Sequence, residues 1–181
     1  MKNQKASVLL YAMQLAPQNG LFVEIGCIRE DHEVATDGYS TVYMSKYCKN
    51  LDLRFVSVDN QEKNVVMANK VLEKEGLKPE VITEDGKKFL EYEDAISFLY
   101  LDSHRHPQYS YDQYINSELA EGAVVAIDDA QPYDDHELGK ATQLVELFEV
   151  EGISWRLIPT EPGFSMVVAK FPRGKKHGML S

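Results

Sequence analysis

The sequence has few of the features that mark membrane, secreted or disulfide-bonded proteins. No segment of its 181 residues approaches the roughly 18 consecutive apolar residues of a transmembrane helix, and the first residues lack a secretory pattern. The two cysteines, Cys27 and Cys48, fit no metal-binding spacing and are too few to cross-link a domain of this length. We therefore expect a cytoplasmic protein in a reducing compartment, with no membrane partner.

Basic residues are scarce relative to acidic ones. Lys and Arg number 19 against 29 Asp and Glu, which gives a formal net charge of −10. This is the wrong sign for a protein that neutralises the phosphates of DNA or RNA, so we expect a small-molecule substrate and no general nucleic-acid partner. A short basic cluster near Arg173 and Lys175 lies in residues 173–181, which we expect to form a flexible, solvated tail.

The spacing of the apolar residues predicts a single α/β domain over residues 1–181. Short, continuously apolar runs are typical of strands buried on both faces in a parallel sheet, whereas apolar residues three and four apart indicate helices. Their alternation predicts an open, doubly wound, mostly parallel sheet of seven strands. Because only three residues separate the last two strands, these two are expected to form an antiparallel hairpin. The predicted strands are 21–26, 54–60, 79–85, 96–103, 122–130, 154–160 and 164–171, and the predicted helices are 5–16, 40–49, 61–75, 86–92, 108–120 and 136–151.

Most of the parallel strands are predicted to end in acidic residues. In an open α/β sheet, ligands bind outside the carboxyl ends of the strands, where the strand order reverses. Several carboxylates along one edge oppose one another's ionisation unless a cationic ligand, ribose hydroxyls or a divalent metal compensates them. A single residue such as Asp59 or Asp85 could instead cap the helix that follows it.

Several motifs, in this order and spacing, resemble the class I S-adenosylmethionine-dependent methyltransferases. Val23-Glu24-Ile25-Gly26 is similar to the first motif of that superfamily, and Gly38-Tyr39-Ser40-Thr41 resembles the start of its first helix. Val58-Asp59, Asp102 and segment 122–129 resemble the ends of its second and fourth strands and its fifth strand. The resemblance covers nearly the whole chain and is strongest to the group of macrocin and other sugar O-methyltransferases and the cephalosporin hydroxylases. It implies a Rossmann-like methyltransferase fold, in which the C-terminal hairpin holds the seventh strand.

The resemblance also implies S-adenosylmethionine as the cofactor and assigns roles to individual residues. Asp59 is expected to accept hydrogen bonds from the ribose hydroxyls, and Asp85 to lie near the adenine amino group with Gly86 behind it. Ser40 begins a helix whose free N–H groups suit the cofactor carboxylate, while Glu24 and Gly26 shape the amino-acid end. The candidate cofactor-binding residues are Glu24, Gly26, Gly38, Ser40, Asp59, Asn60, Asp85, Gly86 and Asp102.

One segment departs from the family pattern. The glycine-rich loop of the family is compact, but here residues 27–37 separate Gly26 from Gly38. Either the second glycine is displaced and the insertion forms a lid, or the cofactor site is altered. We expect the first, because the Gly-x-Ser-Thr motif is intact and long irregular loops are often functional.

The resemblance also suggests residues for the chemical step. Asp102, Asp128 and Asp129 correspond to the Mg²⁺ ligands of metal-dependent O-methyltransferases, and a bound Mg²⁺ would lower the pKa of an acceptor hydroxyl. Alternatively, Asp129 caps a turn and Asp128 binds cofactor or water. His104 and His106 are candidates for the base that accepts the hydroxyl proton, beside the catalytic candidate Asp102. Either histidine could instead be a surface residue or bind substrate.

The sequence thus predicts an S-adenosylmethionine-dependent methyltransferase that acts on a hydroxyl of a small molecule, with or without help from Mg²⁺. The alternative is a non-catalytic or hydroxylase-like relative of the same fold that binds an S-adenosyl or other nucleotide ligand. A nicotinamide-dependent dehydrogenase is disfavoured, because no G-x-G-x-x-G follows the first strand. A homodimer formed through the first helix or the C-terminal hairpin is a further expectation.

Overall fold

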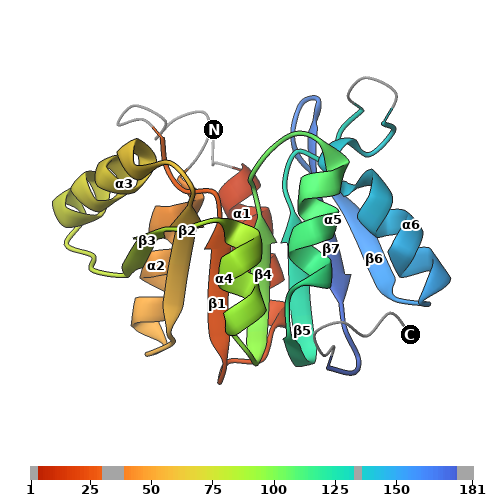
Figure 1. Cartoon of the computed structure of the whole chain (residues 1–181), viewed down its shortest axis with the longest axis horizontal. Coiled ribbons are helices and arrows are strands. Elements are labelled where there is room, and N and C mark those ends of the chain that lie inside the picture. Colours follow the sequence, from red (N-terminus) through yellow and green to blue (C-terminus); the bar gives the residue numbers. More distant parts are fainter. Residues whose placement is uncertain (1–3, 30–38, 133–135, 175–181) are drawn as a thin grey trace.

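One sheet runs through the middle of the molecule (Figure 1). A computed structural model describes residues 4–29, 39–132 and 136–174. Within these ranges seven strands pair in the order β3-β2-β1-β4-β5-β7-β6. The first five strands are parallel to one another, while β7 runs antiparallel to both β5 and β6. The strands are β1 (Leu21–Ile25), β2 (Phe55–Asp59), β3 (Glu80–Thr83), β4 (Ile96–Leu101), β5 (Leu119–Ile127), β6 (Ser154–Glu161) and β7 (Phe164–Lys170). The predicted doubly wound sheet and its C-terminal hairpin are confirmed.

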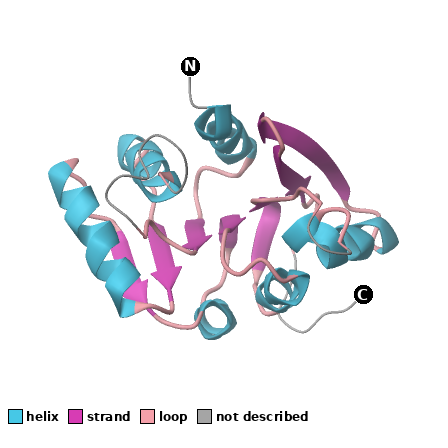
Figure 2. Ribbon diagram, turned by 90° about the horizontal axis from the view of Figure 1, so that it is seen from above, coloured by secondary structure: helices cyan, strands magenta, loops and turns pink. Residues whose placement is uncertain are grey.

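Helices cover both faces of the sheet (Figures 1 and 2). Because successive strand residues point to opposite faces, Phe22 packs toward α1 and α2, whereas Val23 packs toward α4, α5 and α6. The helix α3 packs against α2 beside β2 and β3. The helical elements are α1 (Gln4–Leu15), α2 (Ser40–Asn50), α3 (Glu62–Lys74), α4 (Gly86–Tyr92), α5 (Pro107–Ile115), the 3₁₀ turn η2 (Gly139–Ala141) and α6 (Thr142–Val150). None of the helices in the described ranges is long and apolar enough to span a bilayer.

Two predicted helix boundaries are wrong. The helix predicted over 108–120 ends at Ile115, where the side-chain amide of Asn116 donates to the carbonyl of Asp112 at 2.7 Å. The strand β5 then begins at Leu119 rather than at 122, because Leu119 pairs with Ile96 before the register shifts. The helix predicted over 136–151 begins only at Thr142, after η2.

Backbone hydrogen bonds continue past the strand ends at the carboxyl edge of the sheet. The N–H of Gly26 donates to the carbonyl of Val58 at 2.8 Å, and that of Asp102 donates to Ile25 at 2.9 Å. The N–H of Asp128 similarly donates to the carbonyl of Leu101 at 3.1 Å. The residues that follow β1, β4 and β5 are therefore held in line, and the strand order reverses between β1 and β4.

The two edge strands are short or interrupted. Strand β3 spans four residues and follows Pro79, while β6 contains Pro159. Proline lacks the N–H that pairing requires and is tolerated mainly at sheet edges.

Candidate functional site

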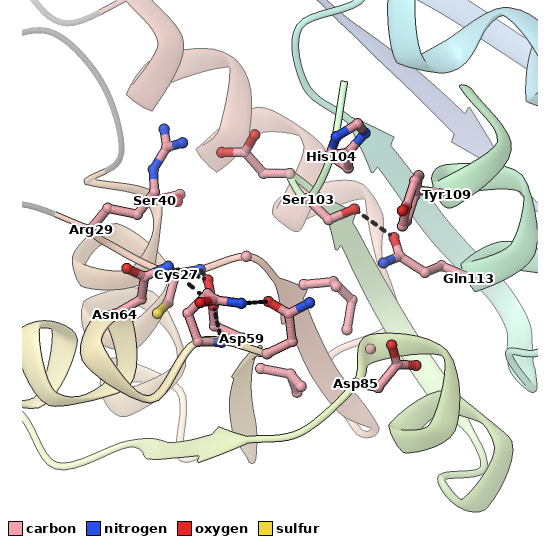
Figure 3. Close-up of a pocket in the computed structure, with 17 residues that line it drawn as sticks. Cys27, Arg29, Ser40, Asp59, Asn64, Asp85, Ser103, His104, Tyr109 and Gln113 are labelled. Atoms are coloured by element: carbon pink, nitrogen blue, oxygen red, sulfur yellow. Dashed lines mark hydrogen bonds between the residues drawn. The ribbon is translucent and has the colours of Figure 1, made fainter. Parts of the chain in front are cut away.

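A cavity of about 290 Å³ opens at the carboxyl edge of the sheet, where the strand order reverses (Figure 3). Eight of the residues predicted to bind cofactor or to act in catalysis line it: Gly26, Ser40, Asp59, Asn60, Asp85, Gly86, Asp102 and His104. The rest of the lining consists of Ile25, Cys27, Arg29, Val58, Gln61, Asn64, Ser103, Tyr109 and Gln113. The position of the cavity is the one at which open α/β sheets bind ligands.

Other predicted site residues lie elsewhere. Glu24 does not line this cavity, because it points to the face covered by α1 and α2 while its neighbour Ile25 points to the other. His106, Asp128 and Asp129 also lie outside the cavity lining. Gly38 and residues 30–37 of the insertion fall outside the described residues.

The carboxylate of Asp59, the last residue of β2, accepts hydrogen bonds from two backbone N–H groups and one side-chain amide. Its Oδ1 accepts the N–H of Gln61 at 2.8 Å, and its Oδ2 accepts the N–H of Cys27 at 3.3 Å. The side-chain amide of Asn64 lies 3.1 and 3.2 Å from the two oxygens. A carboxylate accepts about four hydrogen bonds, so hydroxyls of a ligand would bind Asp59 by displacing the Asn64 amide.

Two glycines allow backbone segments to approach closely around the cavity. Gly26 has φ +98°, and a Cβ there would lie 2.4 Å from the carbonyl oxygen of Asp102. At Gly86 a Cβ would lie 2.5 Å from Cγ2 of Ile25. A larger residue at Gly26 would push the ends of β1 and β4 apart, and a larger residue at Gly86 would push α4 away from β1.

Asp85 caps a helix and also lines the cavity. One of its carboxylate oxygens accepts the N–H of Lys88 at 3.1 Å, which satisfies a free donor at the start of α4. The capping role that the sequence left open is therefore present, and it does not remove the side chain from the cavity.

Glu24 is a fully buried carboxyl group. The hydroxyl of Ser57 donates to its Oε2 at 2.6 Å. Burial raises the pKa of Glu24 to about 7, although the hydroxyls of Ser40, Ser57 and Thr41 favour the charged form. The group thus titrates near neutral pH in the folded protein.

The three acids that follow β4 and β5 form a cluster, as predicted. Carboxylate oxygens of Asp102, Asp128 and Asp129 lie within 4.8 Å of one another. Lys140 Nζ donates to Asp102 Oδ1 at 2.8 Å and lies 3.4 Å from Asp129 Oδ2, while Lys5 forms an ion pair with Asp128. Because ammonium groups already pair with all three carboxylates, the cluster in this arrangement does not fit a divalent cation.

The lysines also set the ionisation of the cluster. Burial raises the pKa of Asp102, but the ammonium groups of Lys140 and Lys5 outweigh it and hold the pKa below its ordinary value. Burial and the charge of Asp102 raise the pKa of Asp128. The charges of Asp102 and Asp129 raise the pKa of Lys140 against the effect of burial, which keeps this lysine charged.

Both predicted catalytic histidines are exposed and use one ring nitrogen within the loop. Nδ1 of His104 accepts the N–H of His106 at 3.1 Å, and Nδ1 of His106 accepts the N–H of Gln108 at 3.3 Å, where it caps α5. A neutral ring with an acceptor at Nδ1 carries its proton on Nε2. In this geometry the free nitrogen of each ring is a donor, which favours binding a substrate oxygen over removing its proton.

The wall beside His104 contains further polar side chains. The ring of Tyr109 lies 4.6 Å from that of His104, and the hydroxyl of Ser103 donates to the side-chain oxygen of Gln113 at 3.0 Å (Figure 3). These groups present both donors and acceptors to a ligand in the cavity.

Comparisons with known proteins identify the fold. No protein-family model matches the chain, and no curated protein matches its sequence. Cofactor-bound Rv0187 from MTB superposes with a TM-score of 0.65 at 16% identity, covering 96% of this chain and 81% of that chain. An O-methyltransferase from Bacillus cereus in complex with SAH gives a TM-score of 0.61 at 18% identity, covering 94% of this chain and 81% of that chain. An rRNA methylase from Streptococcus thermophilus gives 0.63 at 13% identity, covering 91% and 94%. This is a Rossmann-like methyltransferase fold.

O-methyltransferases and rRNA methylases share this methyltransferase fold, so the fold alone does not select the acceptor. The narrower resemblance to the macrocin and cephalosporin hydroxylase group stays a prediction.

Three side chains that contact the predicted site residues were not identified from the sequence. Asn64 could have been identified, because it is a polar residue next to Val65 on the buried face of a predicted helix. No sequence pattern could have identified Lys5 and Lys140, since lysines are usually exposed and their partners lie far away in the chain.

Proposed function

We propose that the chain is an S-adenosylmethionine-dependent methyltransferase that methylates a hydroxyl oxygen of a small molecule. The observation that supports this most directly is the position of Asp59, whose carboxylate lies at the end of β2 in the cavity where the strand order reverses. A carboxylate at this place suits the two ribose hydroxyls of a nucleoside, since it can accept both.

The other lining residues suit the remaining parts of the cofactor. Asp85 and Gly86 lie at the start of α4, where an adenine amino group could donate to the Asp85 carboxylate. Ser40 is buried at the first turn of α2, whose N–H groups favour a carboxylate ligand. Gly26 also lines the cavity, and its lack of a side chain lets the backbone after β1 approach that of Asp102 closely.

Bound S-adenosylmethionine supplies an electrophilic methyl group on a sulfonium ion. The chain's contribution is to hold the acceptor oxygen in line with that methyl group, and such alignment alone can account for much of the rate enhancement. Nε2 of His104 carries the ring proton and can donate it in a hydrogen bond, and the Tyr109 ring lies beside the imidazole in a tilted arrangement, so both side chains suit positioning an acceptor next to Asp102.

The charge of the chain favours a small molecule over RNA. The net charge is −10, and the edge of the sheet that carries the cavity is lined with carboxylates. RNA recognition needs phosphate contacts from basic residues, and among the described residues that line the cavity Arg29 is the only lysine or arginine.

One observation favours the second candidate, a relative that binds a nucleotide without transferring a methyl group. Asp59 already accepts hydrogen bonds from Gln61, Cys27 and Asn64, so ribose must compete with the chain's own donors. This candidate differs from the first in turnover and not in the position of the ligand.

Calorimetric titration with S-adenosylhomocysteine tests both candidates. We expect micromolar binding by the wild type and a loss of at least about tenfold, or 1.4 kcal/mol, in Asp59→Ala, because the ribose hydroxyls lose their acceptor. Asp94→Ala is the matched control, since Asp94 is exposed just before β4, at the amino ends of the parallel strands and away from the cavity. Equal binding by Asp59→Ala and the wild type would refute the assigned site. Binding without methyl transfer to any hydroxyl, amine or thiol acceptor would select the second candidate.

A further inference from the structure

The carboxylates of Asp102, Asp128 and Asp129 are neutralised by lysines from two distant parts of the chain. Lys140 lies on η2, and only 2% of its side chain is exposed. Its Nζ donates to Asp102 and also lies within ion-pair distance of Asp129, at 2.8 and 3.4 Å. Lys5, on α1, forms an ion pair with Asp128. Each carboxylate therefore has an ammonium partner.

The backbone fixes the position of Lys140. The preceding Gly139 has φ +49°, and a Cβ there would lie 2.5 Å from the carbonyl oxygen of Gln131 and 2.7 Å from that of Asp129. The hydroxyl of Thr142 donates to the carbonyl of Gly139 at 3.0 Å and accepts the N–H of Leu138 at 3.2 Å. The turn η2 is thus locked against the segment that carries Asp129, and the Lys140 side chain enters the cluster from it.

A buried ammonium group at this place is stable only because it is paired. Moving an unpaired charge from water into a protein interior is strongly unfavourable, and the two carboxylates next to Lys140 offset that cost. The same three carboxylates have the oxygen ligands and spacing that a hard divalent cation prefers. Two ammonium groups supply the charge of one such cation.

A divalent cation and Lys140 cannot share the cluster at low cost. An ion bound among the three carboxylates would share their oxygens with the Lys140 ammonium, and like charges this close repel strongly in a buried site. Binding of the ion would therefore require the Lys140 side chain to leave its buried position.

We propose that Lys140, together with Lys5, takes the place of a divalent metal ion in this chain, so that the Asp102, Asp128 and Asp129 cluster binds no metal. Lys140 holds the ends of β4 and β5 together and keeps a fixed positive charge beside Asp102, which lines the cavity. The cluster is then complete with protein atoms alone.

Titration of Mn²⁺ followed by electron paramagnetic resonance tests the proposal on the full chain. We expect no binding by the wild type at micromolar Mn²⁺, and a gain of affinity of at least about tenfold in Lys140→Ala, because the variant removes the repelling charge and leaves the carboxylates. Adding Asp128→Asn to Lys140→Ala should remove the gained site. Lys78→Ala, an exposed lysine before β3, is the matched control and should bind no Mn²⁺.

Micromolar Mn²⁺ binding by the wild type that Asp128→Asn abolishes would overturn the proposal, and so would a folded Lys140→Ala with no gained site. If Lys140→Ala does not fold, the proposal is tested instead by thermal unfolding of the wild type with and without divalent cations. An unchanged melting temperature in Mg²⁺, Mn²⁺ and chelator supports the proposal, and a rise with either ion that Asp129→Asn removes refutes it. None of these measurements needs cofactor or methyl transfer, so their outcome is independent of the proposed function.

Discussion

Glu24 places an ionisable group inside the molecule, on the sheet face covered by α1 and α2. Its side chain is fully buried, and the Ser57 hydroxyl donates to it at 2.6 Å. Burial raises the pKa of Glu24 from 4.5 to about 7. In the unfolded chain the group ionises at the lower value, so the folded state binds the additional proton between these two pH values.

The stability of the protein should therefore depend on pH through Glu24. Its contribution is fully present below pH 4.5 and is lost as the pH rises through about 7. We expect Glu24→Gln to remove this dependence. The substitution should therefore stabilise the protein more at pH 8 than at pH 5, and the difference in the free energy of unfolding should be on the order of 1–3 kcal/mol. Urea unfolding of wild type and variant at both pH values measures the difference.

Glu73→Gln is a suitable control, because Glu73 is exposed on α3 and loses its charge in the same way. If the free energy of unfolding of Glu24→Gln depended on pH in the same way as that of the wild type and of Glu73→Gln, Glu24 would ionise in the folded protein as it does in water.

At the scale of the element, the turn η2 depends on one glycine. A Cβ at Gly139 would collide with two backbone carbonyl oxygens, and its φ of +49° is itself unfavourable for other residues. We expect Gly139→Ala to lower the free energy of unfolding by about 3 kcal/mol, from the left-handed conformation and the overpacking together. Thermal or urea unfolding measures it.

Gly76 provides the comparison, because its φ is +66° but a Cβ there would meet no atom within 4 Å. Gly76→Ala should cost only about 1 kcal/mol. Equal costs at the two positions would mean that η2 moves to accept the methyl group and that Lys140 is not held by the backbone.

The elements also show what the sequence could reveal. The strands could be predicted because continuous apolar runs are the signature of burial on both faces, and the acids at their ends followed from the boundaries. The end of α5 could not, because Asn116 and Ser117 close the helix through side-chain bonds that leave no periodic signal. The pairing of Lys140 with Asp102 spans 38 positions and depends on the backbone conformation of Gly139, so local patterns could not reveal it.

At the scale of the whole molecule, the acidic charge should keep RNA away from the cavity. We expect no saturable binding of a fluorescently labelled single-stranded RNA at micromolar protein and physiological salt, because a net charge of −10 repels phosphates. Fluorescence anisotropy measures it. A chain that ends at Gly174 separates the contribution of the basic residues 175–177 from that of the rest of the protein. Micromolar binding by the shortened chain would favour an RNA acceptor.

The two edges of the sheet bear on how the protein behaves when concentrated. An unpaired edge strand presents a row of free backbone donors and acceptors, which is a template for intermolecular β-pairing and fibril growth. Here β3 is only four residues long, and Pro159 interrupts the row of donors along β6. Neither edge of the sheet in the described part of the chain offers a long, uninterrupted template, so these two strands should not initiate cross-β aggregation when the protein is concentrated.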